Sequence, residues 1–188
     1  MELAKAVSYA LHPLTVTFFG FLAFVLATGL PYLSAVVAGA SFSLVPFLIT
    51  LYFRRRGLAK SVLLEGREER VRPMALSLPS YAVGTALSWA LGFSALVPVE
   101  LGYIASTAVI LLVTLKYKVS VHVSVTTGFA SVLTLFASHA FVVTFLFVPL
   151  VAWARLKLKA HTLGQVVAGL LLGGVVSPVL VSVFKTLV

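Results

Sequence analysis

Two histidines, a few basic side chains and one glutamine are the residues of this sequence whose types and spacing could do chemistry. His161 lies six residues after Arg155 and four before Gln165, and His122 lies four residues after Lys118. Side chains four apart on a helix share a face, so Gln165 could hold one ring nitrogen of His161. A neutral imidazole can attack phosphorus while a second one donates a proton to the leaving alkoxide. The pattern therefore indicates phosphoryl transfer.

Further cationic groups come from the polar segment 54–73, the only long polar stretch in the chain. Arginine binds phosphate oxygens in bidentate fashion, and converging arginines can stabilise the charge of a transferring phosphoryl group without a metal. We therefore predict an anion site. Its candidate phosphate-binding residues are Arg67, Arg70, Arg72, Lys118, Ser120 and Arg155.

The composition decides what kind of scaffold must position these residues. Of 188 residues, 61% are hydrophobic and 10% charged, with no cysteine and no aspartate. Soluble domains have about 45–50% apolar and about 25% charged residues, so this chain belongs in a lipid bilayer. Only helices or closed barrels span lipid, and long apolar runs favour helices. We predict an all-α polytopic transmembrane bundle forming a single domain, 1–188, with no metal site, no cofactor and no nucleic-acid partner.

About seven (six to seven) crossings follow from the apolar runs, because one crossing needs about 20 apolar residues. The last run contains Gly169-Leu-Leu-Leu-Gly173, a pattern that lets helices approach closely. The predicted crossings are Leu14–Leu30, Ser34–Phe53, Met74–Leu96, Val99–Leu115, Val119–Ala137, Ala140–Ala154 and Thr162–Phe184.

Alternation of these crossings gathers the charge on one side of the membrane. We name this side the basic face. It holds Lys5, the 54–73 segment, Lys116, Lys118 and the Arg155–His161 loop, and with them 13 of the 14 Lys and Arg residues. By the positive-inside rule the basic face is expected to be cytoplasmic, in the cell membrane.

Several of the basic residues and histidines are expected to have no role in the anion site. Arg54–Arg56, Lys157 and Lys159 are expected only to orient the chain. His12 and His139 are interpreted as packing or interfacial residues. His122 is different, because an ionisable residue just inside a span is functional by default.

At this point the residues resemble the type 2 phosphatidic acid phosphatase superfamily, which includes lipid and prenyl-diphosphate phosphatases and vanadium haloperoxidases. Its third motif, S-R-x5-H-x3-D, is similar to Arg155–Gln165, with Ala154 and Gln165 in place of Ser and Asp. Its second motif, P-S-G-H, resembles Ser120-Val-His122. Its first motif, K-x6-R-P, is similar to the segment that ends at Arg72-Pro73, with Glu65 in place of Lys.

The resemblance implies roles for these positions. His161 would form a phosphohistidine, His122 would be the general acid, and Gln165 would orient His161. Arg72 and Arg155 would hold phosphoryl oxygens with a hydrogen bond from Ser120. The missing lysine's role would pass to Arg67, Arg70 or Lys118.

The expected function is a metal-independent membrane phosphatase for a lipid phosphate or prenyl (di)phosphate. Because Gln165 carries no charge, a non-catalytic lipid-phosphate binding or transport protein is an alternative, and a phosphotransferase is another. A purely structural membrane protein would leave His122 and Lys118 unexplained. Membrane lipids are the expected partners, and the sequence leaves a homo-oligomer open.

Overall fold

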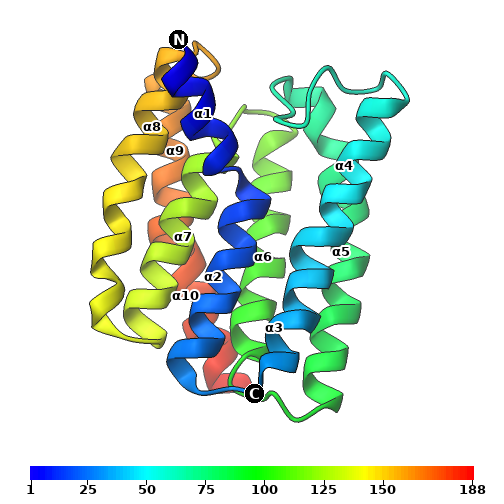
Figure 1. Cartoon of the computed structure of the whole chain (residues 1–188), viewed down its shortest axis with the longest axis vertical. Coiled ribbons are helices and arrows are strands. Elements are labelled where there is room, and N and C mark those ends of the chain that lie inside the picture. Colours follow the sequence, from blue (N-terminus) through cyan, green and yellow to red (C-terminus); the bar gives the residue numbers. More distant parts are fainter.

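The bundle consists of helices and has no strand; the computed structural model describes all residues, 1–188 (Figure 1). Counting helices that run on without a break as one, there are eight. They are α1 (Glu2–Ala10), α2 (Pro13–Thr28), α3–η1–α4 (Tyr32–Gly39, Ala40–Leu44, Val45–Arg55), α5 (Arg67–Ala90), α6 (Val97–Thr114), α7 (Val121–Phe136), η2–α8 (His139–Leu146, Phe147–Lys157) and α9–η3–α10 (Leu163–Leu171, Leu172–Val176, Ser177–Leu187).

Four of these helices are long and apolar enough to cross a membrane, and a fifth crossing is added if the bent pair α1–α2 is one span. The predicted all-α fold is thus confirmed, with four to five helices apolar enough to span a membrane, whereas seven crossings are not confirmed. The two other long helices are more polar or shorter than these. α5 carries a charged first turn from Arg67 to Arg70, and α7 is only 16 residues long and rich in hydroxyl side chains.

The segment 54–73 was wrongly predicted as one polar loop. α4 continues to Arg55 and α5 already begins at Arg67, so only 56–66 lies between helices. Glu68 and Glu69 stand in the first turn of α5, where negative charge interacts favourably with the helix dipole. The helix α1 was not predicted either; it bends by 44° into α2 and packs on α8.

Aromatic side chains fill the centre of the bundle. Phe42 stacks on Tyr81 with ring centroids 4.8 Å apart, and Phe21 and Phe129 meet edge to face at 5.3 Å. The ring of Tyr103 packs against all four of these rings. Its hydroxyl forms a hydrogen bond with Thr17 Oγ1, 2.9 Å away. Large apolar side chains also cover the outside of the helices, as expected where the solvent is lipid.

Gly169 and Gly173 bring the last helix into backbone contact with α7. A Cβ on Gly169 would collide with the carbonyl oxygen of Ser120, and one on Gly173 with that of Ser124. The predicted close approach at this small-residue pair is confirmed. It fixes the start of α7, which carries His122, against the start of α9, which follows His161.

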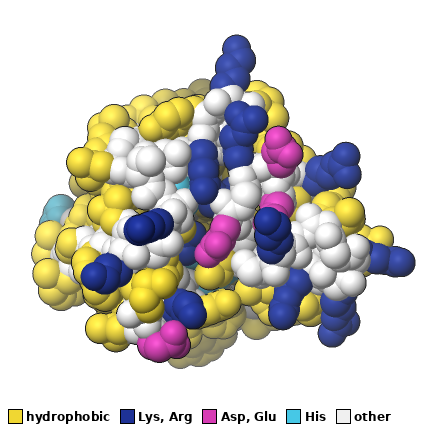
Figure 2. All heavy atoms as spheres, turned by 90° about the horizontal axis from the view of Figure 1, so that it is seen from above, with side chains coloured by type: hydrophobic (Ala, Val, Ile, Leu, Met, Phe, Trp, Pro, Cys, Tyr) yellow, Lys and Arg dark blue, Asp and Glu magenta, His cyan; other side chains and the backbone are white.

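Lysine and arginine side chains gather over one end of the bundle (Figure 2). This end holds the termini of α4, α6 and α8 and the start of α5, and the N-terminus also lies there (Figure 1). Lys185 is at the opposite end, with its ammonium 5.8 Å from the centroid of the Phe136 ring. The structure therefore has the basic face that the alternation of crossings predicts.

Candidate functional site

His161 is held by hydrogen bonds at both ring nitrogens. Its Nδ1 lies 3.0 Å from Gln165 Oε1, and its Nε2 lies 3.2 Å from Nη2 of Arg70. A carbonyl oxygen only accepts, so we assign the proton to Nδ1 and a lone pair to Nε2. Burial, with Arg70 and Arg155 close by, lowers the pKa of His161 from 6.5 to about 3. The imidazole is therefore neutral at pH 7, with its Nε2 lone pair directed at the basic cluster.

Gln165 supports His161 through the first turn of α9. Thr162 and Gln165 form a capping box, in which the Thr162 hydroxyl accepts from Gln165 N and Gln165 Oε1 accepts from Thr162 N. The same Oε1 accepts the Nδ1 proton of His161. The four-residue spacing thus predicted the correct pair, and the helix cap that stabilises α9 also fixes the orientation of the ring.

Arg155 is the most unusual side chain in the molecule. It is fully buried, and its Nε, Nη1 and Nη2 have no hydrogen-bond partner. Nε2 of His122 and the hydroxyls of Ser120 and Ser124 are likewise buried without a partner. Burying an unpaired charge is strongly unfavourable, and a guanidinium cannot discharge itself at neutral pH. These donors can be satisfied together by a multiply charged oxyanion.

Arg70, and not Arg72, joins this cluster. Arg70 is 3% exposed; its Nε donates to Leu64 O at 2.5 Å and its Nη1 to Val119 O at 2.7 Å. Arg72 is exposed and makes no hydrogen bond, so the predicted phosphate-binding position at Arg72 is not brought to the cluster. Two residues along a helix turn the side chain by about 200°, which places the two arginines on opposite sides of α5.

Lys118 and Arg67 lie at the edge of the cluster. Lys118 Nζ donates to Ala160 O at 2.7 Å and so holds the loop that carries His161. Partial burial, with Arg70 and Arg155 nearby, lowers the pKa of Lys118. Arg67 instead donates to the carbonyls of Leu115 and Lys116, which ties α5 to the end of α6 and leaves Arg67 outside the cluster.

His12 belongs to the site, although its sequence suggested only packing. It lies between α1 and α2, and its ring meets the edge of His122 at a centroid distance of 5.5 Å. Its Nδ1 accepts from Leu14 N, so its Nε2 donates to Val62 O at 3.1 Å. The signal that could have found it is its position just before the first crossing, which alternation places on the basic face. His139 lies exposed at the other end, as its plainer interpretation allows.

Two neighbouring cavities reach the cluster. One of about 90 Å³ is bordered by His12, Arg70 and His122. The other is a groove of about 650 Å³ between α2 and α3–η1–α4, with mainly apolar walls. Both are lined by His12, Leu14 and Val62, so the groove on the apolar surface leads directly to the cavity beside the site.

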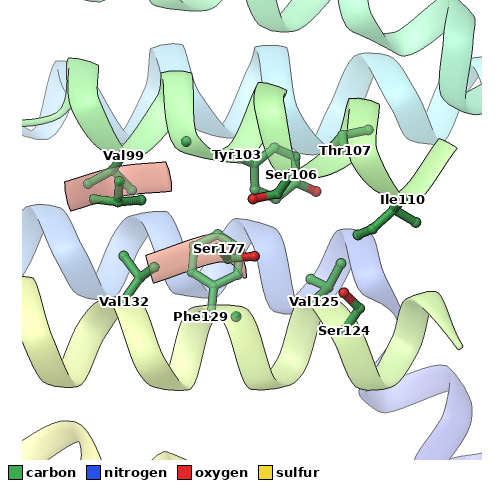
Figure 3. Close-up of a pocket in the computed structure, with 13 residues that line it drawn as sticks. Val99, Tyr103, Ser106, Thr107, Ile110, Ser124, Val125, Phe129, Val132 and Ser177 are labelled. Atoms are coloured by element: carbon green, nitrogen blue, oxygen red, sulfur yellow. The ribbon is translucent and has the colours of Figure 1, made fainter. Parts of the chain in front are cut away.

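A third, smaller cavity continues from the site into the bundle between α6, α7 and α10 (Figure 3). Its volume is about 40 Å³, and the hydroxyls of Ser106, Ser124 and Ser177 lie along it among apolar side chains. It shares Tyr103 and Thr107 with the cavity beside His122. Hydroxyl groups from three helices thus extend the polar environment of the site from His122 toward the middle of the bundle.

Metal-binding side chains are not grouped anywhere in the molecule: no three His, Cys, Asp or Glu residues are placed to hold one ion. The donors of the site are cationic or neutral, which suits an anion. No protein-family model, curated protein or solved structure matches this chain.

Proposed function

We propose that the chain is a metal-independent phosphatase of the membrane that hydrolyses a lipid phosphate or prenyl (di)phosphate. The observation that carries the proposal is Arg155, a fully buried guanidinium with three unpartnered nitrogens beside two histidines. A phosphoryl group supplies the oxygens that these donors need. The proposal keeps the resemblance to the type 2 phosphatidic acid phosphatases, with Arg70 in the place expected for Arg72.

The proposed reaction has two steps. His161 Nε2 attacks phosphorus and the bond from phosphorus to the ester oxygen breaks. His122, which takes up a proton when the phosphoryl dianion binds beside it, gives that proton to the leaving alkoxide. In the second step His122 takes a proton from water, whose oxygen attacks the phosphohistidine. The P–N bond breaks, the lone pair returns to Nε2, and phosphate leaves. Arg70 and Arg155 stabilise the charge of the phosphoryl group in both steps.

A lipid substrate is favoured by the groove between α2 and α3–η1–α4. Its apolar wall includes the exposed side chains of Phe19, Val36 and Phe47, and its inner end is at His12. An acyl or prenyl tail in the groove would place its phosphate at the cluster without leaving the apolar phase. We further propose seven crossings of the cell membrane, including α5 and α7, with the basic face in the cytoplasm.

Gln165 favours a second candidate, a lipid-phosphate binding or transport protein on the same scaffold. Its amide accepts from His161 Nδ1 but has no charge to stabilise the imidazolium character that develops during attack. In that case the site would bind the phosphate without forming a bond to His161.

The test is phosphate release by the purified full chain in EDTA, from phosphatidate, phosphatidylglycerol phosphate and prenyl phosphates. We expect turnover, an acid-labile phosphorylated protein, and loss of both in His161→Ala. His139→Ala is the matched control and should behave as the wild type. Tight binding without turnover would favour the binding protein, and product formed only with an added acceptor would indicate a phosphotransferase. Full activity of His161→Ala would exclude the proposed mechanism.

A further inference from the structure

Residues Val62–Glu65 form a strap beside the site, between α4 and α5. Three donors hold its backbone: His12 Nε2 bonds to Val62 O at 3.1 Å, Arg70 Nε to Leu64 O at 2.5 Å, and Arg70 Nη2 to Glu65 O at 3.5 Å. Leu64 has φ +46°, a left-handed conformation that bulky residues rarely adopt. Such a conformation persists where contacts on several sides enforce it. The strap is therefore fixed relative to the cluster.

The two ends of the strap have different environments. Val62, Leu63 and Leu64 line the cavity beside His122, and Leu63 is buried. Glu65 is exposed, and its carboxylate lies within Coulombic range of Arg70, Lys118 and Arg155. It forms no ion pair with any of them, since the only ion pair in the chain joins Lys5 to Glu2. The strap thus holds one negative charge next to the proposed anion site; Glu69 of α5 is within Coulombic range of Arg70 alone, whereas Glu65 is within range of all three cations.

We propose that Glu65 is a specificity-determining residue that makes the site accept phosphomonoesters in preference to diphosphates. The inference rests on the proposed function, because it concerns the same site. At a given distance, the repulsion between a carboxylate and an anionic ligand grows in proportion to the charge of the ligand. A phosphomonoester carries about −1.5 to −2 at pH 7, and a diphosphate carries more. The three cations attract both ligands, but the carboxylate penalises the diphosphate more strongly.

Glu68 provides a matched control for Glu65. It is also an exposed glutamate, three residues further along in the first turn of α5, and it does not interact with Arg70, Lys118 or Arg155. Substitution of Glu65 and of Glu68 changes the net charge of the protein equally. Only substitution of Glu65 changes the charge next to the site.

The experiment is calorimetric binding of orthophosphate and pyrophosphate to the purified full chain, with Glu65→Gln, Glu65→Lys and the two corresponding Glu68 variants. Removing the negative charge of Glu65, at about a Debye length from the bound anion, should tighten binding roughly twofold for each unit of negative charge on that anion. Glu65→Gln should then bind orthophosphate about threefold and pyrophosphate about tenfold more tightly, and Glu65→Lys more so. The same variants should shift kcat/KM from a prenyl monophosphate toward the diphosphate of the same chain.

The outcomes separate the two proposals. A ratio of pyrophosphate to orthophosphate affinity that is the same in the wild type and both Glu65 variants overturns the role of Glu65 and leaves the anion site standing. An equal change in the Glu68 variants also overturns it, because the effect would then come from net charge. If the wild type binds neither anion, the anion site fails, and the role of Glu65 fails with it.

Discussion

Two side chains of opposite charge are fully buried at opposite ends of the bundle, Arg155 near the basic face and Glu100 in the first turn of α6. Glu100 Oε1 accepts from Ser88 Oγ at 2.9 Å, and its Oε2 has no partner. A carboxyl group can take up a proton and become neutral, whereas a guanidinium remains charged. Burial alone therefore does not identify a binding site. A buried group that cannot discharge itself needs a counter-ion.

Arg155 and Glu100 also differ in the ionisable groups around them. Arg155 lies within Coulombic range of Arg70, His122 and His161, and both Arg70 and His122 line the cavity of about 90 Å³. Glu100 accepts a hydrogen bond from the Ser88 hydroxyl, and no charged side chain lies close enough to act on it. We interpret Glu100 as part of the packing between α5 and α6, and Arg155 as part of the site.

The largest effect is expected for Arg155→Met, which keeps the length of the side chain and removes its charge. Phosphate release should fall by about a thousandfold, since stabilising charge on the phosphoryl group is lost. The free energy of unfolding without ligand should rise by about 1–4 kcal/mol, because an unpaired buried charge is replaced by an apolar group. Steady-state kinetics and denaturation in detergent measure both. Retained activity together with lower stability would contradict the comparison.

The second effect concerns the pH dependence of stability. The pKa of His161 is about 3 in the folded chain and near 6.5 when unfolded, so below pH 6.5 the unfolded state binds a proton that the folded state does not. Stability should therefore fall as the pH decreases from about 6.5 toward about 3. We expect His161→Gln to remove about 3 kcal/mol of the stability difference between pH 7 and pH 4. Identical differences in variant and wild type would show that His161 is not responsible.

A smaller effect is expected for Gln165→Glu. The glutamate can keep the capping box with Thr162 and adds a charge beside His161 Nδ1, which should raise the pKa of His161 and increase kcat about tenfold. Its negative charge should also raise KM for an anionic substrate. Nuclear magnetic resonance titration of labelled histidine and steady-state kinetics would measure these changes. An unchanged pKa would mean that the Nδ1 contact is lost in the variant.

Glu100→Gln should have the smallest effect. Its amide can still accept from Ser88, so we expect phosphate release within about twofold of the wild type and a stability change below about 1 kcal/mol. The same assays used for Arg155→Met apply. A tenfold loss of activity would contradict the assignment of Glu100 to packing, because it would show that the two ends of the bundle are coupled.

Much of the fold could be predicted because apolar run length and charged flanks report directly on helices in lipid. The predicted crossings Val99–Leu115 and Val119–Ala137 differ from α6 and α7 by two residues or fewer at each end. The pair His161 and Gln165 was also accessible, because one helical turn relates the two residues. In both cases a local spacing determines the structure.

The identity of the arginine in the site could not be obtained in this way. Arg72 was expected to hold the phosphoryl oxygens because it precedes Pro73 as in the first motif, and segment 54–73 had no assigned helical phase. With α5 beginning at Arg67, it is Arg70 that faces the cluster. His12 was missed because its role depends on contacts with Val62 and His122, which are 50 and 110 residues away. The first error comes from the unknown start of a helix, and the second comes from tertiary packing, which spacing along the chain does not encode.

The backbone contact that Gly169 and Gly173 make with α7 has a consequence for biosynthesis. His12 is made early, while His161 and the helix that aligns it against α7 are made last. The final helix must leave the ribosome and dock on α7 before His161 is held next to Arg70 and the site is complete. Until that moment the proposed anion site is incomplete, so the proposed activity toward lipid phosphates would begin only after the whole chain has been made.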